Sequence, residues 1–185
     1  MNGVKVTKLW IERFVIGLRL CPFARYSFYD DTIYYESSNA TKLEDCLNDL
    51  LSIVQKMDKT SSKNLSNAFV IFNASYSFFD MLDLKEYLDS HLEENELLDQ
   101  FQFVVFHPEF QFADEEFHAS GNFTNRSPLP MIHILREDEV AQAIEKTEDV
   151  DRIPYRNKEV LEKIKIKKIS EVFEDRFMEK INTYI

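Results

Sequence analysis

The chain has 185 residues, of which 44% are hydrophobic, so one domain can bury a sizeable core. Its formal net charge of −11 repels polyanions, which excludes nucleic acids and acidic membrane surfaces as expected partners. The three glycines are too few for a GxGxxG or GxxxxGK[ST] loop, so the glycine-rich phosphate sites of nucleotide-binding proteins are excluded as well.

The cysteine content and the hydropathy pattern indicate the cellular compartment in which the protein is expected. Cys21 and Cys46 form no CxxC pair, and two thiols make no disulfide framework. Charged residues interrupt the apolar stretch 9–20, and no small-residue cleavage site follows it, so no signal peptide is predicted. No apolar run reaches the roughly 18 residues that cross a membrane. We therefore expect a cytoplasmic protein.

Hydrophobic periodicity predicts a helix, then β-α-β-α-β-β, then further helices. The first helix covers 4–21, and Pro22 ends it or starts the next one. The later predicted helices are 41–57, 78–95, 137–145, 154–164 and 169–183. The predicted strands are 32–36, 68–72, 101–107 and 131–136. Residues expected to be buried include Phe79, Leu82, Leu84, Tyr87, Leu88 and Leu92 in the third helix, and Val172, Phe173, Phe177 and Ile181 in the last.

This order of elements predicts an α/β (α+β) fold with a compact, layered sheet of about four strands. Strands that alternate with helices favour a parallel or mixed sheet, and the last two strands can pair antiparallel. A ferredoxin-like variant with extra N- and C-terminal helices is the specific arrangement we expect. No repeat or linker divides the chain, so 1–185 is predicted to be a single domain.

The loop 108–130, between the last two strands, is the predicted location of a site. Loops longer than about 12–15 residues are usually functional or disordered. Phe110, Phe112, Phe117 and Phe123 can anchor this one, which favours order. We expect a self-packed loop that carries a site, with a purely structural flap as the alternative.

Two histidines lie where the loop joins the strands. Alternation places Phe103, Val105 and His107 on one face of the strand 101–107. His133 shares a face of the strand 131–136 with Met131. If the two strands pair antiparallel, His107 and His133 could meet on one face of the sheet and transfer protons. The alternative for each is a hydrogen-bonded core histidine.

Between these histidines, Asn125, Arg126 and Ser127 are concentrated in one short polar stretch. Arg126 offers a planar fork for a carboxylate or a phosphate, and its neighbours could add hydrogen-bond donors. The stretch could therefore bind an anion without glycines. The alternative is a turn in which Asn and Ser side chains bond their own backbone.

Pro154 opens a predicted helix whose first turn contains Arg156 and Asn157. Backbone N–H groups in a first turn attract anions, so this turn could complete an anion site. A solvated first turn is the alternative.

Cys21 allows two interpretations. As the N-cap of a helix that starts at Pro22, its thiol would be activated; otherwise it is a buried, inert thiol. A metal site is a further possibility, because His107, His118 and His133 accompany acidic residues in the loop. Their spacing matches no zinc signature.

Four blocks resemble the signature blocks of a bacterial family known only as domain of unknown function 1415. They are VIGLRLCPFA at 15–24, VVFHPEFQFA at 104–113, NFTNRSPLPMIHILRE at 122–137 and IPYRN at 153–157. The resemblance spans about 8–165 and leaves 169–183 as a C-terminal extension. It implies that the family motif positions include Cys21, His107, Asn125, Arg126, Ser127, His133, Arg136, Arg156 and Asn157. It implies no reaction.

Three functions remain open. The first is an enzyme that acts on a small anionic metabolite, a carboxylate or a phosphate, by hydrolysis or group transfer. In that interpretation His107, His133 and Cys21 are catalytic, and Asn125, Arg126, Ser127, Arg136, Arg156 and Asn157 bind the substrate. The second is a non-catalytic binding or protein-interaction domain, for which an exposed Phe110, Phe112 and Phe117 would indicate docking. The third is a histidine-based metalloprotein. The sequence identifies neither a cofactor nor an oligomeric state.

Overall fold

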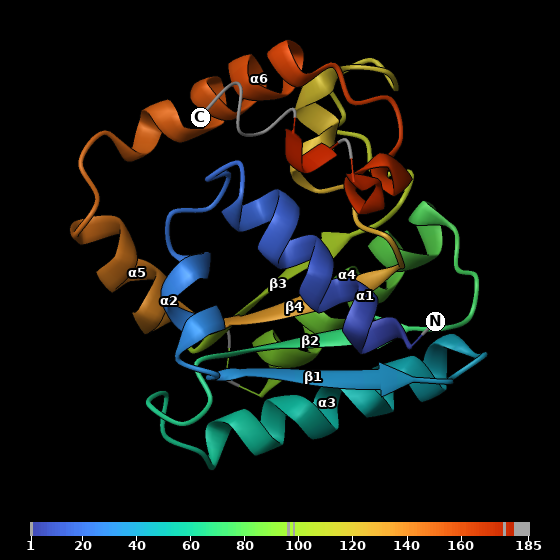
Figure 1. Cartoon of the computed structure of the whole chain (residues 1–185). Coiled ribbons are helices and arrows are strands. Elements are labelled where there is room, and N and C mark those ends of the chain that lie inside the picture. The colour runs from blue at the N-terminus through green and yellow to red at the C-terminus, as the bar shows by residue number, and fades with distance from the viewer. Residues whose placement is uncertain (1, 96, 98, 176, 180–185) are drawn as a thin grey trace.

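The computed structural model describes residues 2–95, 97, 99–175 and 177–179. Four strands form one sheet in the order β1-β2-β4-β3. β1 (Ile33–Ser38) runs parallel to β2 (Asn67–Phe72), and β4 (Met131–Arg136) runs antiparallel to both β2 and β3 (Phe101–Phe106). Helices cover both faces (Figure 1). The predicted layered fold, with a mixed four-stranded sheet and an antiparallel last pair, is confirmed.

The ferredoxin-like variant is not the arrangement that the chain adopts. That fold has the order β-α-β-β-α-β. Here a second helix, α4 (Phe78–Glu94), carries the chain from β2 to the edge strand β3, and β4 returns between them. The last strand of the chain is therefore central in the sheet, and helices lie above and below it.

The first face of the sheet packs against α3 (Leu43–Asp58) and α4, as Figure 1 shows below and behind the strands. Ser77 and Asp80 form a capping box that starts α4. Leu84, Leu88 and Leu92 are buried as predicted. The prediction that Phe79, Leu82 and Tyr87 point inward is wrong, because they lie outside the stripe that α4 turns to the sheet.

The second face packs against α1 (Gly3–Trp10), η1 (Ile11–Ile16) and α6 (Ile153–Ile164). The first predicted helix is in the expected place, but its second half is a π-helical turn. A Cβ on Gly17 would lie 2.1 Å from the carbonyl oxygen of Arg13. The chain therefore needs glycine where the π turn ends.

The other elements lie around the second face. They are α2 (Ala24–Tyr29), η2 (Ser120–Thr124), α5 (Glu137–Glu145), η3 (Val150–Arg152) and η4 (Ile169–Phe173). The bounds of α5 agree with the prediction, and α6 carries Pro154 in its first turn as expected. The expected last helix instead begins with the 3-10 turn η4. Val172 and Phe177 are buried as predicted, whereas Ile181 lies outside the described residues.

One further property of the helices concerns membranes. In the described part of the chain, no helix combines the length and the apolar character needed to span a bilayer.

Candidate functional site

His107 follows β3 directly, and both of its ring nitrogens are engaged. Nδ1 accepts the N–H of Glu109 at 3.0 Å. Nε2 therefore carries the proton and donates to the carbonyl oxygen of Tyr76 at 2.9 Å. The ring packs against Phe78 and is only 4% exposed. These contacts are those of a hydrogen-bonded core histidine, the alternative that the sequence left open.

His133 lies in the middle of β4 and stacks on Phe69 of β2, with ring centroids 3.9 Å apart. Its Nε2 lies 2.9 Å from Oδ1 of Asn67. The residue as a whole is only partly buried, but its imidazole is densely surrounded by protein, and this burial lowers the pKa of His133 to about 3. The imidazole is therefore neutral at pH 7. No hydrogen bond from the described residues reaches Nδ1.

The two histidines point to opposite faces of the sheet. The register places Val104 opposite His133, and residues directly opposite each other in an antiparallel pair point to the same side. His107 lies three residues beyond Val104 and so points to the other side, as Phe103 and Val105 do. The expectation that His107 and His133 meet on one face is wrong. The alternation within each strand follows from the sequence, but the register between the two strands does not.

Arg126 is buried in the loop between β3 and β4 and binds the loop's own carbonyl groups. Nε donates to the carbonyl oxygen of Phe110 at 3.1 Å, and Nη2 donates to that of Phe117 at 2.5 Å. The guanidinium also lies 4.6 Å from the ring centroids of Phe117 and Phe123. Burial lowers the pKa of Arg126, and Glu109 partly opposes this effect. The fork expected to bind an anion thus holds the loop together.

Asn125 and Ser127, on either side of Arg126, also bond the backbone. Asn125 Nδ2 donates to the carbonyl oxygen of Val105 at 3.4 Å, and Ser127 Oγ donates to that of Leu129 at 2.6 Å. The main chain of both residues pairs with His107. This geometry is the self-bonded turn that the sequence offered as the alternative to an anion site.

Arg136 lies at the other end of β4, beside the C-terminus of α3. Nη2 donates to the carbonyl oxygens of Met57 and Thr60 at 2.5 and 2.7 Å, and Nε donates to that of Leu65 at 3.2 Å. Arg126 and Arg136 therefore bind main-chain carbonyls at separate places, so the arginines do not assemble into one cradle.

The first turn of α6 lies against the turn that precedes Cys21. Arg156 Nη2 donates to the carbonyl oxygens of Leu18 and Arg19, the first at 3.1 Å. Asn157 Nδ2 donates to the carbonyl oxygen of Leu20 at 2.7 Å. These bonds bring Arg156, Asn157 and Cys21 together from segments more than 130 residues apart in the sequence.

Cys21 combines features of both interpretations of its thiol. The N–H groups of Phe23 and Ala24, at the start of α2, point to its sulfur and favour the thiolate. Burial has the larger effect, so the pKa of Cys21 is raised overall. The thiol is therefore protonated at neutral pH.

Three buried side-chain atoms lack a hydrogen-bond partner among the described residues: Thr7 Oγ1, Trp10 Nε1 and Asn157 Oδ1. All three belong to α1 and α6, the helices over the second face. Buried polar atoms are almost always paired, so each unpaired atom needs an explanation. The sequence pointed to Asn157 only; nothing in the pattern of α1 marks Thr7 or Trp10.

A model of one protein family matches most of this chain. The model of the family described as protein of unknown function (DUF1415) matches residues 3–171. The chain belongs to this DUF1415 family. No curated protein and no solved structure matches it.

In this DUF1415 protein the four blocks form two pairs. The block 15–24 meets 153–157 through the bonds of Arg156 and Asn157. The block 104–113 pairs with 122–137 across β3 and β4 and through Arg126. The two pairs are adjacent, because Lys158 on α6 forms an ion pair of 2.8 Å with Glu115 in the loop.

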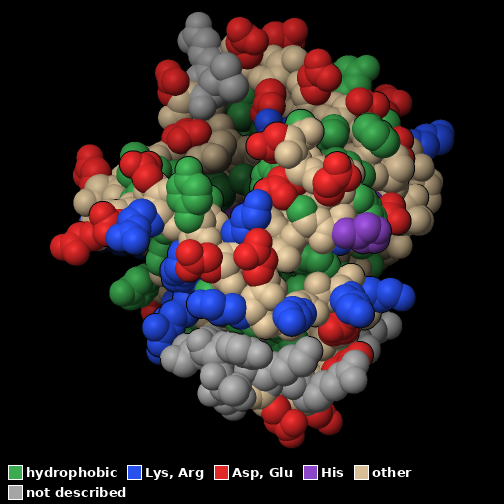
Figure 2. All heavy atoms as spheres, turned by 90° about the horizontal axis from the view of Figure 1, so that it is seen from above, with side chains coloured by type: hydrophobic (Ala, Val, Ile, Leu, Met, Phe, Trp, Pro, Cys, Tyr) green, Lys and Arg blue, Asp and Glu red, His purple; other side chains and the backbone are tan. Residues whose placement is uncertain are grey.

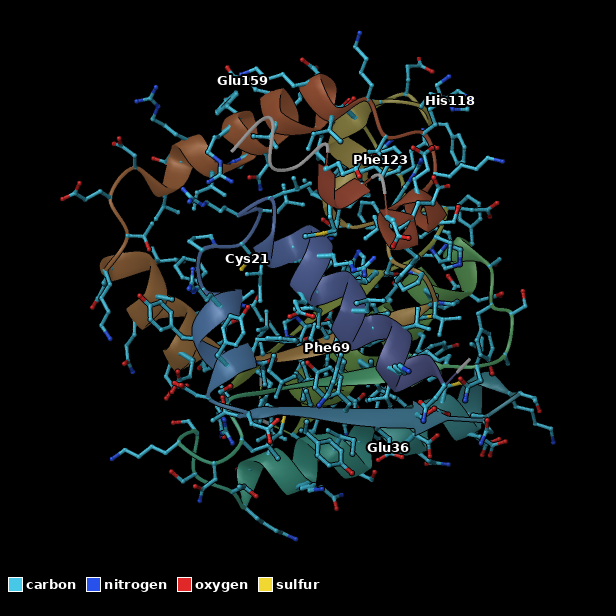
Figure 3. All side chains as sticks on the ribbon, in the orientation of Figure 1. Cys21, Glu36, Phe69, His118, Phe123 and Glu159 are labelled. Atoms are coloured by element: carbon cyan, nitrogen blue, oxygen red, sulfur yellow. The ribbon has the colours of Figure 1, made fainter. Side chains whose placement is uncertain are left out.

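The second-face side of this DUF1415 protein is hollowed. Figure 2, seen from that side, shows a depression in the left half of the surface with apolar side chains at its base. Val104, Phe106 and His133, which point to this side, are only partly buried. Figure 3 shows Cys21 on the same side of the sheet as Phe69, between α2 and α6, whereas His118 lies far away at the edge of the molecule.

The aromatic loop and the histidines give less support to the other two functions. Phe110 is buried against Phe78, whereas Phe112 and Phe117 are 37% and 41% exposed, so the loop is neither a full docking patch nor fully buried. Within residues 2–95, 97, 99–175 and 177–179, no three His, Cys, Asp or Glu side chains group to hold a metal ion.

Proposed function

We propose that this protein binds a small anionic metabolite in the interior between the sheet and the layer of α1, η1 and α6. The observation that carries the proposal is the location of the unpaired buried atoms of Thr7, Trp10 and Asn157, all in this layer. Trp10, Leu20 and Leu161 belong to one hydrophobic cluster, which places α1 and the surroundings of Asn157 in the same interior. A ligand that pairs with these atoms would remove the cost of leaving them buried and unpaired.

The unpaired atoms define what the ligand must offer. Asn157 Oδ1 can only accept a hydrogen bond, so the ligand needs an O–H or N–H group that donates one. Trp10 Nε1 only donates, so the ligand also needs an acceptor. Arg156 is exposed and uses Nη2 on the backbone, so it supplies positive charge beside these groups. A small carboxylate or phosphate that carries a hydroxyl or amino group meets all three requirements.

Binding is favoured over catalysis by the state of the candidate reactive groups. The raised pKa of Cys21 leaves a protonated thiol, which is a weak nucleophile. The low pKa of His133 makes it a weak proton acceptor at pH 7. His107 uses both ring nitrogens within the fold. We therefore assign Cys21 and His133 to the walls of the binding site.

Thermal unfolding tests the binding proposal. Glycolate, lactate, glycine, acetate, propionate and inorganic phosphate would each be added at millimolar concentration. A ligand at 100 times its dissociation constant adds about 2.7 kcal/mol, which shifts the Tm of a protein of this size by several degrees. We expect a shift with at least one compound that carries both an anionic group and a donor.

The Asn157→Ala variant should lose this ligand-induced shift, measured against its own unliganded Tm. The control is Asn48→Ala, at an exposed position of α3, which should keep it. The proposal fails if no compound stabilises the wild-type protein, or if Asn157→Ala responds as the wild type does.

Catalysis by hydrolysis or group transfer is our second candidate. It is favoured by the two N–H groups that point to the sulfur of Cys21. The rate of Cys21 alkylation by iodoacetamide across pH 6–9, read by peptide mass spectrometry, tests it, with Cys46 of the same chain for comparison. A midpoint below the ordinary cysteine value of about 8.5 would support a nucleophile. A midpoint above it, the result we expect, supports binding.

A further inference from the structure

We propose that copies of this chain associate head to tail, with the outer face of α4 on one copy against a lysine strip at the end of α6 on the next. The outer face of α4 presents apolar side chains among carboxylates. The lysine strip consists of Lys163, Lys165, Lys167 and Lys168. The inference goes beyond the proposed function and does not depend on it.

Helix α4 is apolar on two sides. Leu84 and Leu88 face the sheet and are buried. Phe79, Leu82 and Tyr87 lie outside that stripe and are 74%, 39% and 66% exposed. A surface helix normally has one apolar stripe, which faces the core, and turns polar residues to the solvent. Large apolar side chains gathered on the outer face of a helix are typical of a surface that binds another protein.

Carboxylates surround these apolar side chains. α4 contains six Asp and Glu residues and one lysine, a net charge of −5. The lysine, Lys85, is paired with Asp89, and Asp80 caps the helix. The other four acidic residues are exposed and form no ion pair within the described part of the chain; they are Asp83, Glu86, Glu93 and Glu94. Their charge is available to a partner.

The lysine strip results from alternation in the stretch 163–168. Ile164 and Ile166 are buried in the cluster over the second face, and Lys165 and Lys167 beside them are exposed. Among the residues that the structure describes, none of the strip's four lysines forms an ion pair. Figure 2 shows Lys and Arg side chains in a row across this side of the molecule. The strip therefore offers four positive charges at the surface.

A second copy of the chain fits both surfaces. The four carboxylates of α4 equal the ammonium groups of the lysine strip in number and are opposite in sign. The net charge of −11 does not prevent the contact, because the Debye length is about 8 Å at physiological salt. Facing charges then attract each other while the distant charges of the two copies are screened. Apolar side chains surrounded by complementary charges are the usual composition of a protein interface.

The two surfaces lie on opposite sides of the sheet. α4 packs on the first face, and α6 packs on the second (Figure 1). Two copies related by a two-fold axis therefore cannot join both surfaces at once. Each contact leaves a free α4 on one copy and a free lysine strip on the other. Such a heterologous contact adds further copies and builds a chain or a ring.

Sedimentation velocity of the wild-type protein tests the association. At about 20 mM NaCl, we expect the mean sedimentation coefficient to rise as the protein concentration is raised to about 100 μM. At about 500 mM NaCl the Debye length falls to about 4 Å, so the association should weaken at least about 10-fold. A sedimentation coefficient that does not depend on protein concentration at low salt overturns the proposal.

Charge reversal on each surface tests which surfaces meet. Asp83→Lys with Glu86→Lys changes α4, and Lys167→Glu with Lys168→Glu changes the lysine strip. All four positions are exposed, and thermal unfolding verifies that both variants fold. We expect each variant alone to remain a single chain at low salt. A mixture of the two should associate again, because each variant retains the surface that the other lacks.

Two control variants change the net charge by the same amount at exposed positions outside both surfaces: Glu145→Lys with Glu148→Lys, and Lys59→Glu with Lys63→Glu. Both should associate as the wild-type protein does. Phe79→Gln removes an exposed ring without changing the charge, and should weaken the association at least about 5-fold.

Three results contradict the head-to-tail contact. The first is association of either charge-reversed variant alone. The second is a mixture of the two folded variants that stays dissociated, which is the result expected if α4 binds α4 of the next copy. The third is an unchanged affinity in Phe79→Gln.

Discussion

At the scale of single residues, some buried polar side chains of the described chain bond the backbone, whereas three others each leave one atom without a partner. His107, Arg126 and Arg136 direct their nitrogens to backbone groups of their own fold. Trp10 and Asn157 are buried, as His107 and Arg126 are, but each leaves one atom without a partner among the described residues. Burial alone therefore does not identify the candidate site; incomplete hydrogen bonding does.

The first prediction concerns His133 and pH. Its pKa is about 3 in the folded protein and about 6.5 when unfolded, so the unfolded state binds more protons as the pH falls below 6.5. The free energy of unfolding is unaffected above that pH and decreases as the pH falls toward 3. Between pH 7.5 and 5.0 the loss due to His133 should be about 2 kcal/mol, measured by urea denaturation.

His133→Gln should remove this part of the pH dependence. His118→Gln, at an exposed position, is the matched control and should retain it. A loss of the same size in His133→Gln as in the wild-type protein would show that His133 is not held neutral by burial.

At the scale of elements, Arg126 is the centre of the loop between β3 and β4. Its bonds to the carbonyl oxygens of Phe110 and Phe117 hold together the two ends of the segment 110–117, which precedes η2 in the loop. Asn122 adds bonds to Phe112 and Glu116. The loop is therefore ordered by buried polar groups that replace the regular ladder of a sheet.

We predict that Arg126→Lys loosens this loop. Lysine cannot donate in two directions from a planar group, so at least one carbonyl would lose its partner, at a cost of about 1–3 kcal/mol. Hydrogen exchange should become faster in 108–125 and stay unchanged in β2. Arg152→Lys, an exposed ion-paired residue, serves as the control. Unchanged exchange in Arg126→Lys would contradict a holding role.

The π turn that ends the first helix gives another prediction. Gly17→Ala would place a Cβ 2.1 Å from a carbonyl oxygen of Arg13, so the backbone must shift. We expect a loss of about 1–3 kcal/mol in urea denaturation. Gly121→Ala would meet only the Glu115 side chain, at 3.3 Å, and should change stability much less. Equal effects of the two substitutions would argue against the steric requirement at Gly17.

Much of the element order could be predicted from the sequence, because local patterns determine it. The run of apolar residues in β2 and the alternation in β3 identify strands, and Pro154 marks the start of α6. The ferredoxin-like expectation was wrong because strand order depends on which strand pairs with which across the sheet. The π turn also escaped prediction, since it differs from an α-helix only in its hydrogen bonds.

Some residues of the candidate site could be predicted from the sequence, and their role in a site stays a prediction. Arg156, Asn157 and Cys21 were singled out, and they lie together. His107 and His133 were expected on one face because the sequence does not determine the register between β3 and β4. A shift of that register by one residue turns every side chain of a strand to the opposite face of the sheet. Trp10 was not anticipated, because an unpaired N–H depends on its three-dimensional neighbours rather than on any sequence pattern.

At the scale of the whole molecule, charge is distributed unevenly. The stretch 152–168 has seven Lys and Arg residues and two Glu, a net charge of +5, whereas the rest of the chain has a net charge of −16. This stretch includes α6, which carries Arg156 and Asn157. An anion is therefore repelled by most of the surface and attracted at the helix that borders the candidate site.

This distribution predicts a salt dependence. The affinity for glycolate should fall when NaCl is raised from 20 to 200 mM, because salt screens the attraction of exposed lysines such as Lys163 and Lys167. Lys163→Glu should lower the affinity at low salt and reduce the effect of salt. Affinities independent of salt in calorimetry would show that this charge plays no part in binding.

The most direct test of the central claim uses Trp10, because it is the single tryptophan of the chain. Its indole N–H gives one resonance in a ¹H–¹⁵N NMR spectrum, which reports on the atom proposed to bind the ligand. Titration with glycolate and lactate should shift this resonance in a saturable manner, and Asn157→Ala should weaken the response. An indole resonance that does not move, at concentrations where calorimetry detects binding, would contradict a binding site in this interior.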